Sequence, residues 1–446
     1  MSQPPKANDV KTIAPSYRWF LLVLLFLAYF FHQSDRAIFG IVSTSIKESF
    51  DMPDKILYMT RTIMFTLMAL IVPVAGFFGD KVNKRKLLIS CLFCWSVATI
   101  CTGFVTNVWG LIIFNSVGLV VAEAFYGPAS TSLISAYHTK TRAIALSVHQ
   151  TAVYLSVIVG GYLAAKVCEL CQGALGADGW RGTFWTYGGI SVLVGIMLVL
   201  WLKDPSKVRI AGETTTDAPK ATEKPSVSEF LNMIFSNPSA LLLTVGFTAI
   251  VFVNNAYLNV VPKFLQEKFE LSQTAAGWNG MFWHHIAAFG CIYIGGWVSD
   301  TIASKNPSYR PKQQFFAMAI GAPVVAFLGA VNSLTTLYAL FFLMGVCRGF
   351  YECNTHASVF ETVPAKYRST TVGFMIFFAF LIGAWSCQMV AAFTDHFGME
   401  LGYKYAFAAL GGAWIIGAAC VGVAAFGTFK RDRARRLAAE EASETK

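Results

Sequence analysis

Charged residues are scarce in this chain of 446 residues. Only 13% are Asp, Glu, Lys or Arg, whereas 55% are hydrophobic and 15% are aromatic. A soluble domain carries roughly a quarter charged residues, and one soluble core cannot hide this much apolar surface. The composition excludes an ordinary soluble protein and predicts an all-α membrane protein, because each apolar crossing must satisfy its backbone hydrogen bonds internally.

Signatures of enzymes and cofactors are also missing. No GxxxxGK[ST] loop occurs, so we expect that ATP does not drive the protein directly. The ten cysteines form no disulfide framework, and Cys168 and Cys171 are interpreted as packing residues. No Ser/His/Asp constellation and no metal-ligand spacing stands out. We therefore expect no catalytic residue, no metal and no cofactor, and we do not expect an enzyme.

Long apolar stretches predict twelve transmembrane helices in two pseudo-symmetric six-helix halves. The halves are 18–202 and 238–427, with an N-terminal segment over 1–17, a polar linker over 203–237 and a basic tail over 428–446. Each span approaches or exceeds the ~20 residues that a helix needs to cross the bilayer. The predicted spans are 18–46, 56–79, 86–105, 108–137, 142–167, 182–202, 238–264, 272–299, 313–331, 334–361, 369–393 and 402–427.

The distribution of basic residues predicts the orientation. With both termini in the cytoplasm, 25 of the 35 Lys and Arg residues lie in inner segments, which agrees with the positive-inside rule. Lys263 is assigned to an outer loop, and Arg61 is expected to snorkel to the outer surface. We expect a multi-pass protein of the plasma membrane, or of the inner membrane in a bacterium, that acts as a monomer. The basic tail would contact anionic lipid and not nucleic acid.

Short motifs of the first half recur in the second. Gly76-Phe-Phe-Gly-Asp80 matches Gly296-Trp-Val-Ser-Asp300 at an offset of 220 residues, and Phe125-Tyr126 matches Phe350-Tyr351 at an offset of 225. Such internal duplication is typical of transporter folds, in which the substrate binds between the two repeats.

The first of these motifs belongs to a longer pattern. Gly76-x-x-x-Asp80-Lys81-x-Asn83-x-Arg85-Lys86 resembles the loop signature of the major facilitator superfamily, with Asn83 where the family usually has Gly. The resemblance covers all twelve spans and implies a transporter that works by alternating access. It also implies a conformational latch between the halves, formed by Gly76, Asp80, Lys81, Arg85 and, in the second copy, Asp300.

Two other motifs resemble particular branches of that family. Asp35-Arg36 and Ala122-Glu-Ala-Phe-Tyr-Gly-Pro-Ala129 are similar to the anion:cation symporters and to the spinster-like proteins. The first branch implies proton-coupled symport of a small organic anion, such as a sugar acid or a monocarboxylate, and we take it as the main hypothesis. The second implies movement of a lysolipid or another amphipath. A transporter-like membrane sensor is a third alternative, which the short linker disfavours.

Ionisable residues within spans are costly and usually face a cavity. Asp35 and Arg36 are adjacent, and neighbours on a helix point about 100° apart, so each requires a partner on another helix. We expect Glu123 of the fourth span to pair with Arg36, which leaves Asp35 to take a proton. Glu123 as the proton-coupling residue is the rival assignment, and a static ion-pair network is the structural alternative.

The tenth span carries a second set of ionisable residues. Arg348, Glu352 and His356 are spaced by four and are predicted to lie along one helical face. Arg348 is a candidate for binding an anion and Glu352 for proton coupling, although the two can also pair within the helix.

Other polar residues within spans are candidates for hydrogen bonds to the substrate. They can equally bond neighbouring helices, and the histidines titrate in a range that suits proton coupling. The predicted substrate-binding residues are Arg36, Arg348, Tyr126, His149, Tyr154, Asn254, Asn255, His284 and His356.

Overall fold

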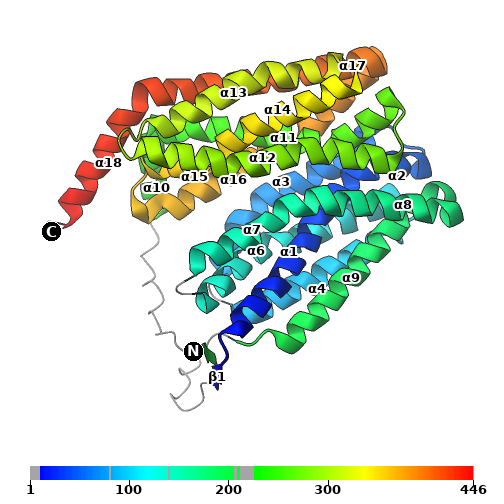
Figure 1. Cartoon of the computed structure of the whole chain (residues 1–446), viewed down its shortest axis with the longest axis horizontal. Coiled ribbons are helices and arrows are strands. Elements are labelled where there is room, and N and C mark those ends of the chain that lie inside the picture. The colour runs from blue at the N-terminus through cyan, green and yellow to red at the C-terminus, as the bar shows by residue number, and fades with distance from the viewer. Residues whose placement is uncertain (1–10, 80–81, 139–140, 205–207, 211–225, 445–446) are drawn as a thin grey trace. The chain divides into compact units, whose positions relative to one another are not determined.

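Helices make up nearly all of the described chain (Figure 1). The structure is a computed structural model and describes residues 11–79, 82–138, 141–204, 208–210 and 226–444. The prediction of an all-α protein is confirmed, apart from one pair of very short strands. Apolar helices are expected here because, in a bilayer, each segment must satisfy its backbone hydrogen bonds internally.

The chain divides into two units. The first unit comprises Met1–Asp51 and Ile71–Ala221, and the second comprises Met52–Leu70 and Thr222–Lys446. Helix α3 (Asp54–Gly79) therefore contributes its first part to the second unit and its last turns to the first.

The first unit holds eight further α-helices in its described part. Two π-helices, Ile113–Gly118 and Ser156–Gly160, and a 3₁₀ turn at Gly176–Asp178 connect some of them. The α-helices are α1 (Ser16–Ile41), α2 (Ser43–Phe50), α4 (Lys84–Thr102), α5 (Val108–Ile112), α6 (Leu119–Tyr137), α7 (Arg142–Leu155), α8 (Gly161–Leu175) and α9 (Gly179–Trp201).

The second unit is also helical throughout its described part. Two 3₁₀ turns, Leu328–Ala330 and Ala365–Tyr367, and a π-helix, Ala424–Thr428, lie between its α-helices. These are α10 (Val227–Phe235), α11 (Pro238–Phe269), α12 (Gln273–Ala303), α13 (Tyr309–Phe327), α14 (Leu334–Glu352), α15 (Thr355–Phe360), α16 (Arg368–Gly383), α17 (Ser386–Val423) and α18 (Phe429–Glu444).

Ten segments of the described chain are long and apolar enough to cross a membrane. Two of them, Ile144–Trp201 and Ala365–Glu441, each cover two of the twelve predicted spans. Within the second, α17 is interrupted at Gly398, whose φ of 76° favours glycine. This break falls between the predicted eleventh and twelfth spans, and the number of twelve crossings stays a prediction.

A short parallel ladder joins two segments that the sequence assigned to irregular structure. Strand β1 (Lys11–Ile13) pairs with β2 (Val208–Ile210), with Lys11 opposite Val208 and Ile13 opposite Ile210. Helix α10, which lies in the predicted linker, was also not expected. Three-residue strands and a nine-residue helix are too short for a clear periodic pattern.

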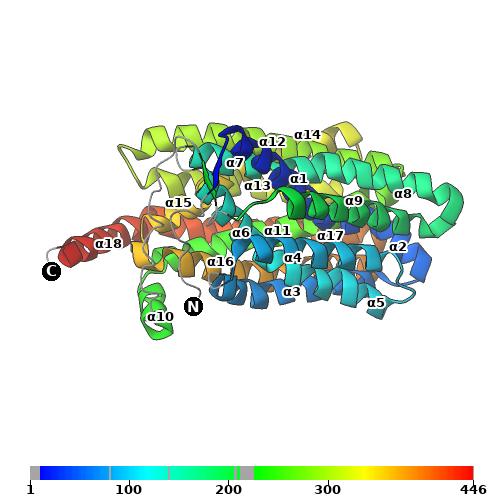
Figure 2. The same cartoon turned by 90° about the horizontal axis from the view of Figure 1, so that it is seen from below.

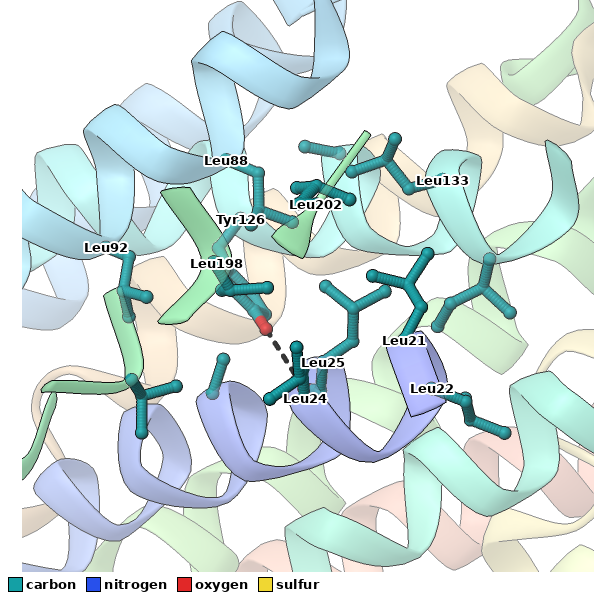
Figure 3. Close-up of a cluster of buried hydrophobic side chains, with 14 of the residues drawn as sticks. Leu21, Leu22, Leu24, Leu25, Leu88, Leu92, Tyr126, Leu133, Leu198 and Leu202 are labelled. Carbon is teal, nitrogen blue, oxygen red and sulfur yellow. Dashed lines mark hydrogen bonds between the residues drawn. The ribbon is translucent and has the colours of Figure 1, made fainter. Parts of the chain in front are cut away.

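Leucine side chains of four helices form the core of the first unit (Figure 3). Leu21, Leu22, Leu24 and Leu25 come from α1, and they meet apolar residues of α4, α6 and the end of α9. The hydroxyl of Tyr126 donates a hydrogen bond to the carbonyl of Leu25 at 3.2 Å. This packing fixes the first half of α1 against α6 and thereby positions the polar residues that follow on both helices.

Close contacts between helices, made at glycines, position the polar residues in each unit. A Cβ atom at Gly160 would lie 2.1 Å from Oγ of Ser34, so only glycine lets α1 approach the π-helix at the residue before Asp35. In the second unit, a Cβ at Gly345 of α14 would lie 2.1 Å from the carbonyl oxygen of His284 on α12. That crossing brings His284 beside the next turn of α14.

Candidate functional site

An ion pair connects α1 and α6 in the first unit. Nη1 of Arg36 lies 3.2 Å from Oε1 of Glu123. The Glu123 side chain is 8% exposed, whereas that of Arg36 is 23% exposed, so the carboxylate is enclosed and the guanidinium is less covered. The partner on another helix that the sequence predicts for Arg36 is therefore present.

Asp35 faces a different helix from its neighbour. Its Oδ2 accepts hydrogen bonds from the indole N–H of Trp95 and from the hydroxyl of Thr99, the latter at 2.6 Å, and both donors lie on α4. The angle of about 100° between neighbouring side chains explains why Asp35 meets α4 while Arg36 meets α6. Because an indole N–H can only donate, Oδ2 is occupied as an acceptor. A proton taken up by this carboxyl group would therefore bind Oδ1.

Aromatic rings lie on the same face of α1 as Arg36. Tyr29 and His32 precede it by seven and four residues, which places the three side chains along one helical face. The Tyr29 ring stacks on His149 of α7 with centroids 4.4 Å apart, and His32 stacks on Tyr126 of α6 at 4.9 Å. This face of α1 thus carries a charged group at one end and aromatic rings at the other.

His149 has unused hydrogen-bonding capacity. Its side chain is 1% exposed, and neither ring nitrogen has a hydrogen-bond partner among the described residues. Buried polar groups are normally hydrogen-bonded, so a water molecule or a ligand group is needed here. Tyr154 lies five residues further along α7 and is half-buried. That spacing places it on another face of the helix, away from the stacked rings.

The second unit contains an arginine–glutamate pair within one helix. Nε of Arg348 donates to Oε1 of Glu352 at 2.7 Å, one turn later in α14. Nη1 of Arg348 lies 3.2 Å from Nε2 of His284 on α12. A guanidinium has no acceptor, so this nitrogen of His284 accepts the hydrogen bond, and the neutral ring carries its proton on Nδ1. Two helices therefore hold the Arg348 side chain.

Two asparagines of α11 also retain open hydrogen-bonding groups. Within the described chain, Oδ1 of Asn254 and Nδ2 of Asn255 have no hydrogen-bond partner. Three residues after Asn254, the Tyr257 ring lies against His284 with centroids 4.5 Å apart. The amides thus supply one donor and one acceptor for water or for a polar ligand.

His356 does not continue the stripe that was predicted for the tenth span. Helix α14 ends at Glu352, and His356 lies on α15 with an exposed side chain. The prediction of one continuous stripe is wrong because the helix stops before Asn354. The Asn354 side chain is buried and accepts hydrogen bonds from Ser299 at 2.7 Å and from Arg310 at 3.2 Å.

Two basic residues that were predicted near the outer surface are buried. Arg61 is 1% exposed and donates to the sulfur of Met64 at 3.0 Å, so it does not snorkel to a surface. The Lys263 side chain is 1% exposed within α11 and forms ion pairs with Asp54 and Glu267. The loop assignment of Lys263 was wrong because its carboxylate partners allow a charge to lie inside the helical unit.

The predicted latch residues are only partly described. Asp80 and Lys81 lie outside the described residues, and Gly76 lies in α3. In the second copy, Oδ1 of Asp300, near the end of α12, forms an ion pair with Nη2 of Arg310 at 2.8 Å, and 72% of the Asp300 side chain is exposed.

Arg85 has a local structural role. Its guanidinium donates to the backbone carbonyls of Leu202 and, at 2.9 Å, of Val199. These carbonyls end α9, where the last four lack partners within the helix.

Among the described residues, no group of three His, Cys, Asp or Glu side chains is placed to hold a metal ion.

A family model described as Major Facilitator Superfamily matches residues 25–387. The chain belongs to this superfamily. It is therefore a multi-pass membrane transporter and not an enzyme, which confirms the resemblance in the loop signature.

The curated relatives point to one branch of the superfamily. The chain is 24% identical to protein spinster homolog 1 of Xenopus laevis over 84% of its own length and 72% of the relative. It is 22% identical to protein spinster of Drosophila melanogaster over 85% of its length and 62% of that relative. The sphingosine-1-phosphate transporter SPNS2 of Xenopus tropicalis matches 45% of the chain at 26% identity, over 38% of its own length.

Solved structures show the same fold. A bacterial homologue of the human lysosomal transporter spinster superposes with a TM-score of 0.78 at 20% identity, covering 94% of this chain and 98% of the other. The nucleoside transporter NupG superposes with a TM-score of 0.68 at 11% identity, covering 92% and 98%.

Sequence reasoning missed several residues around Asp35 and Arg36. Trp95 and Thr99 hold Asp35, and Tyr29 and His32 share the face of Arg36. The helical spacing from Arg36 could have indicated Tyr29 and His32. No comparable signal marks α4 as the partner of Asp35, because that contact depends on how the helices pack.

Proposed function

We propose that this transporter moves an amphipath with an anionic head group, coupled to protons. The spinster-like relatives support the substrate class, since one of them is named a sphingosine-1-phosphate transporter. The observation that carries the proposal is that two adjacent residues of α1 contact different helices. Arg36 pairs with Glu123 of α6, whereas Asp35 is hydrogen-bonded to α4.

Arg36 is the proposed contact for the anionic head. Its guanidinium presents several N–H donors in a fixed plane, which suits a phosphate or a carboxylate. Binding would compete with Glu123 for these donors. The apolar part of the substrate would lie along Tyr29 and the rings stacked with it, Tyr126 and His149.

Asp35 is the proposed proton carrier. Trp95 and Thr99 fix the carboxyl group through Oδ2, so uptake or release of a proton at Oδ1 need not move the side chain. Glu123 is the rival, because it becomes available for a proton whenever substrate takes Arg36. In the second unit, we assign Arg348 to a second anion contact and Glu352 to its counter-charge. Asp80, with its loop, is assigned to the latch.

A small organic anion, such as a sugar acid, is the second candidate substrate. The open amide groups of Asn254 and Asn255 favour it, because hydroxyl groups of a sugar acid would satisfy them. The two candidates differ in whether the substrate has a long apolar part, so they can be separated by binding alone.

The first experiment compares ligands by thermal unfolding of the purified protein, since a ligand stabilises the state that it binds. We expect stabilisation by a single-chain alkyl phosphate but not by the alcohol of the same chain length. Arg36→Lys should weaken this binding about 10-fold, because an ammonium cannot reproduce a planar two-donor contact. Stabilisation by a hexuronate and not by the alkyl phosphate would favour the second candidate.

The second experiment tests coupling in proteoliposomes that contain a pH-sensitive dye. Asp35→Asn should keep binding but lose substrate-dependent proton movement, whereas Asp395→Asn, an exposed carboxylate elsewhere, should keep both. Proton movement that survives in Asp35→Asn and is lost in Glu123→Gln would transfer the proton role to Glu123.

A further inference from the structure

A cavity of about 320 Å³ lies at one end of the second unit. It is bounded by the start of α13, by the end of α15, by the start of α16 and by α18. Figures 1 and 2 show α10, α15 and α18 together at this end of the unit. The residues that line it are Arg310, Ala357, Phe360, Glu361, Arg368 and Arg436.

The residues that line the cavity carry more positive than negative charge, although Arg310 and Arg436 each pair with a carboxylate outside the lining. The lining contributes three guanidinium groups and a single carboxylate, Glu361, which is itself paired with Arg433 of α18 at 2.9 Å. Arg368 donates to the carbonyl of Phe360 at 3.2 Å and lies over its ring. In the part of the chain that the structure describes, Arg368 has no carboxylate partner. An anion in this cavity would therefore reduce an uncompensated charge.

Two of the arginines also have unused donors. The Nε atoms of Arg368 and Arg436 are buried and have no acceptor among the described residues. Leaving a buried donor unsatisfied is unfavourable, and Nε–H together with a terminal N–H forms the donor fork that binds phosphate oxygens in pairs. Arg436 also binds Glu440 through Nη1 at 2.9 Å, which orients its side chain.

Helix α18 is anchored, so this end of the unit is preformed. The carboxylate of Asp432 accepts hydrogen bonds from the backbone N–H of Ser239, at 3.0 Å, and from its hydroxyl, at 2.7 Å. The ion pair of Arg433 with Glu361 adds a second attachment one residue later. Arg436, one turn further along α18, is therefore held at the cavity by the fold.

The surroundings of the cavity favour a lipid as the source of the anion. A second cavity of about 200 Å³ shares Arg436 and is also lined by Met233 of α10. Helix α10 turns Val227, Leu231 and Phe235 outward, and their spacing of four residues places them on one face. An exposed apolar face on a short amphipathic helix is typical of a helix that lies in the membrane interface.

We propose that the cavity binds the phosphate of an anionic phospholipid headgroup, with Arg368 and Arg436 as the main ligands and α10 lying among the adjoining lipids. The positive end of the unit is the one that the sequence predicts to be cytoplasmic, where anionic lipid attracts basic residues. The site is separate from the transport site and does not depend on the substrate proposed above.

The test measures binding of phosphatidylglycerol to the purified full-length protein in detergent, by native mass spectrometry and by lipid-dependent thermal unfolding. Arg368→Gln/Arg436→Gln should weaken binding about 30-fold, the effect expected of two basic groups beside an anionic head. Lys305→Gln/Lys430→Gln removes two exposed charges at the same end and should change affinity less than 3-fold. Arg36→Lys should leave phosphatidylglycerol binding unchanged, which distinguishes this site from the substrate site.

Three outcomes would overturn the proposal. Binding of phosphatidylcholine as tight as that of phosphatidylglycerol would remove the role of charge. An equal loss of affinity in both double variants would assign the effect to net charge. The same Arg368- and Arg436-dependent stabilisation by inorganic phosphate at matched concentration would make the cavity a free-phosphate site. If the Gln pair fails to fold, Arg368→Lys alone should still weaken binding, and unchanged affinity in that variant would contradict the proposal.

Discussion

Both units contain an arginine–glutamate pair, but the two pairs are built differently. Arg36 and Glu123 come from two helices, 87 residues apart in the sequence, whereas Arg348 and Glu352 are neighbours on one turn of α14. The first pair exists only while α1 and α6 keep their positions. The second persists as long as α14 stays helical, and His284 holds its arginine from a further helix.

This difference indicates which pair is suited to coupling. A pair between helices changes when either helix moves or when a ligand takes one partner, so it can link binding to a conformational change. A pair within one helix is less sensitive to such movement and acts as a fixed charge arrangement. This difference supports our proposal that proton coupling takes place in the first unit and that Arg348 has an auxiliary role.

The largest effect is expected from breaking the pair between helices. Glu123→Gln should lower the free energy of unfolding by about 2–3 kcal/mol, because it removes the carboxylate that compensates Arg36 in a mostly buried position. The partial exposure of Arg36, 23% of its side chain, keeps the cost below that of a fully buried pair. Equilibrium unfolding in mixed detergent micelles measures it, and a loss under 0.5 kcal/mol would show that the pair is not structural.

The matched change in the second unit should cost less. Glu352→Gln should lower the free energy of unfolding by about 1 kcal/mol, because pairs one turn apart on a helix contribute modestly and His284 still accepts from Arg348. The same micelle titration applies. If Glu352→Gln destabilises as much as Glu123→Gln, the proposed distinction between the two pairs is incorrect.

The ion pair in the first unit could be predicted from the sequence, whereas the residues around it could not. Two adjacent charges in an apolar span point in different directions, so partners on other helices follow from helical geometry. That geometry does not say which helix Asp35 meets, and Trp95 and Thr99 were missed for this reason. The fold class followed from composition and from a specific loop signature, neither of which depends on tertiary contacts.

Errors arose where tertiary contacts override a local pattern. The spacing of Arg348, Glu352 and His356 predicts one stripe, but the helix ends before Asn354, whose side chain bonds two other segments. Lys263 was placed in a loop because it lies near the end of an apolar run. Its partner Asp54 is 209 residues away in the sequence, and no sequence pattern connects the two.

The smallest effect on stability is expected from substitutions in the two copies of the latch motif. Because folding should stay intact in these variants, they can show an effect on transport alone. The Asp300 side chain is 72% exposed, whereas that of its partner Arg310 is 19% exposed. Pairs with one member so open to solvent contribute about 0–1 kcal/mol. Asp300→Asn should therefore change the free energy of unfolding by less than about 0.5 kcal/mol.

Asp80→Asn, the matched change in the first copy, should also leave folding intact but should slow turnover, because the family signature there implies a latch. Initial uptake rates in proteoliposomes at equal protein content measure this difference. Wild-type turnover in Asp80→Asn would argue against the latch. Slowed turnover in Asp300→Asn at unchanged stability would instead show that both copies take part in the conformational cycle, although only one retains the basic run.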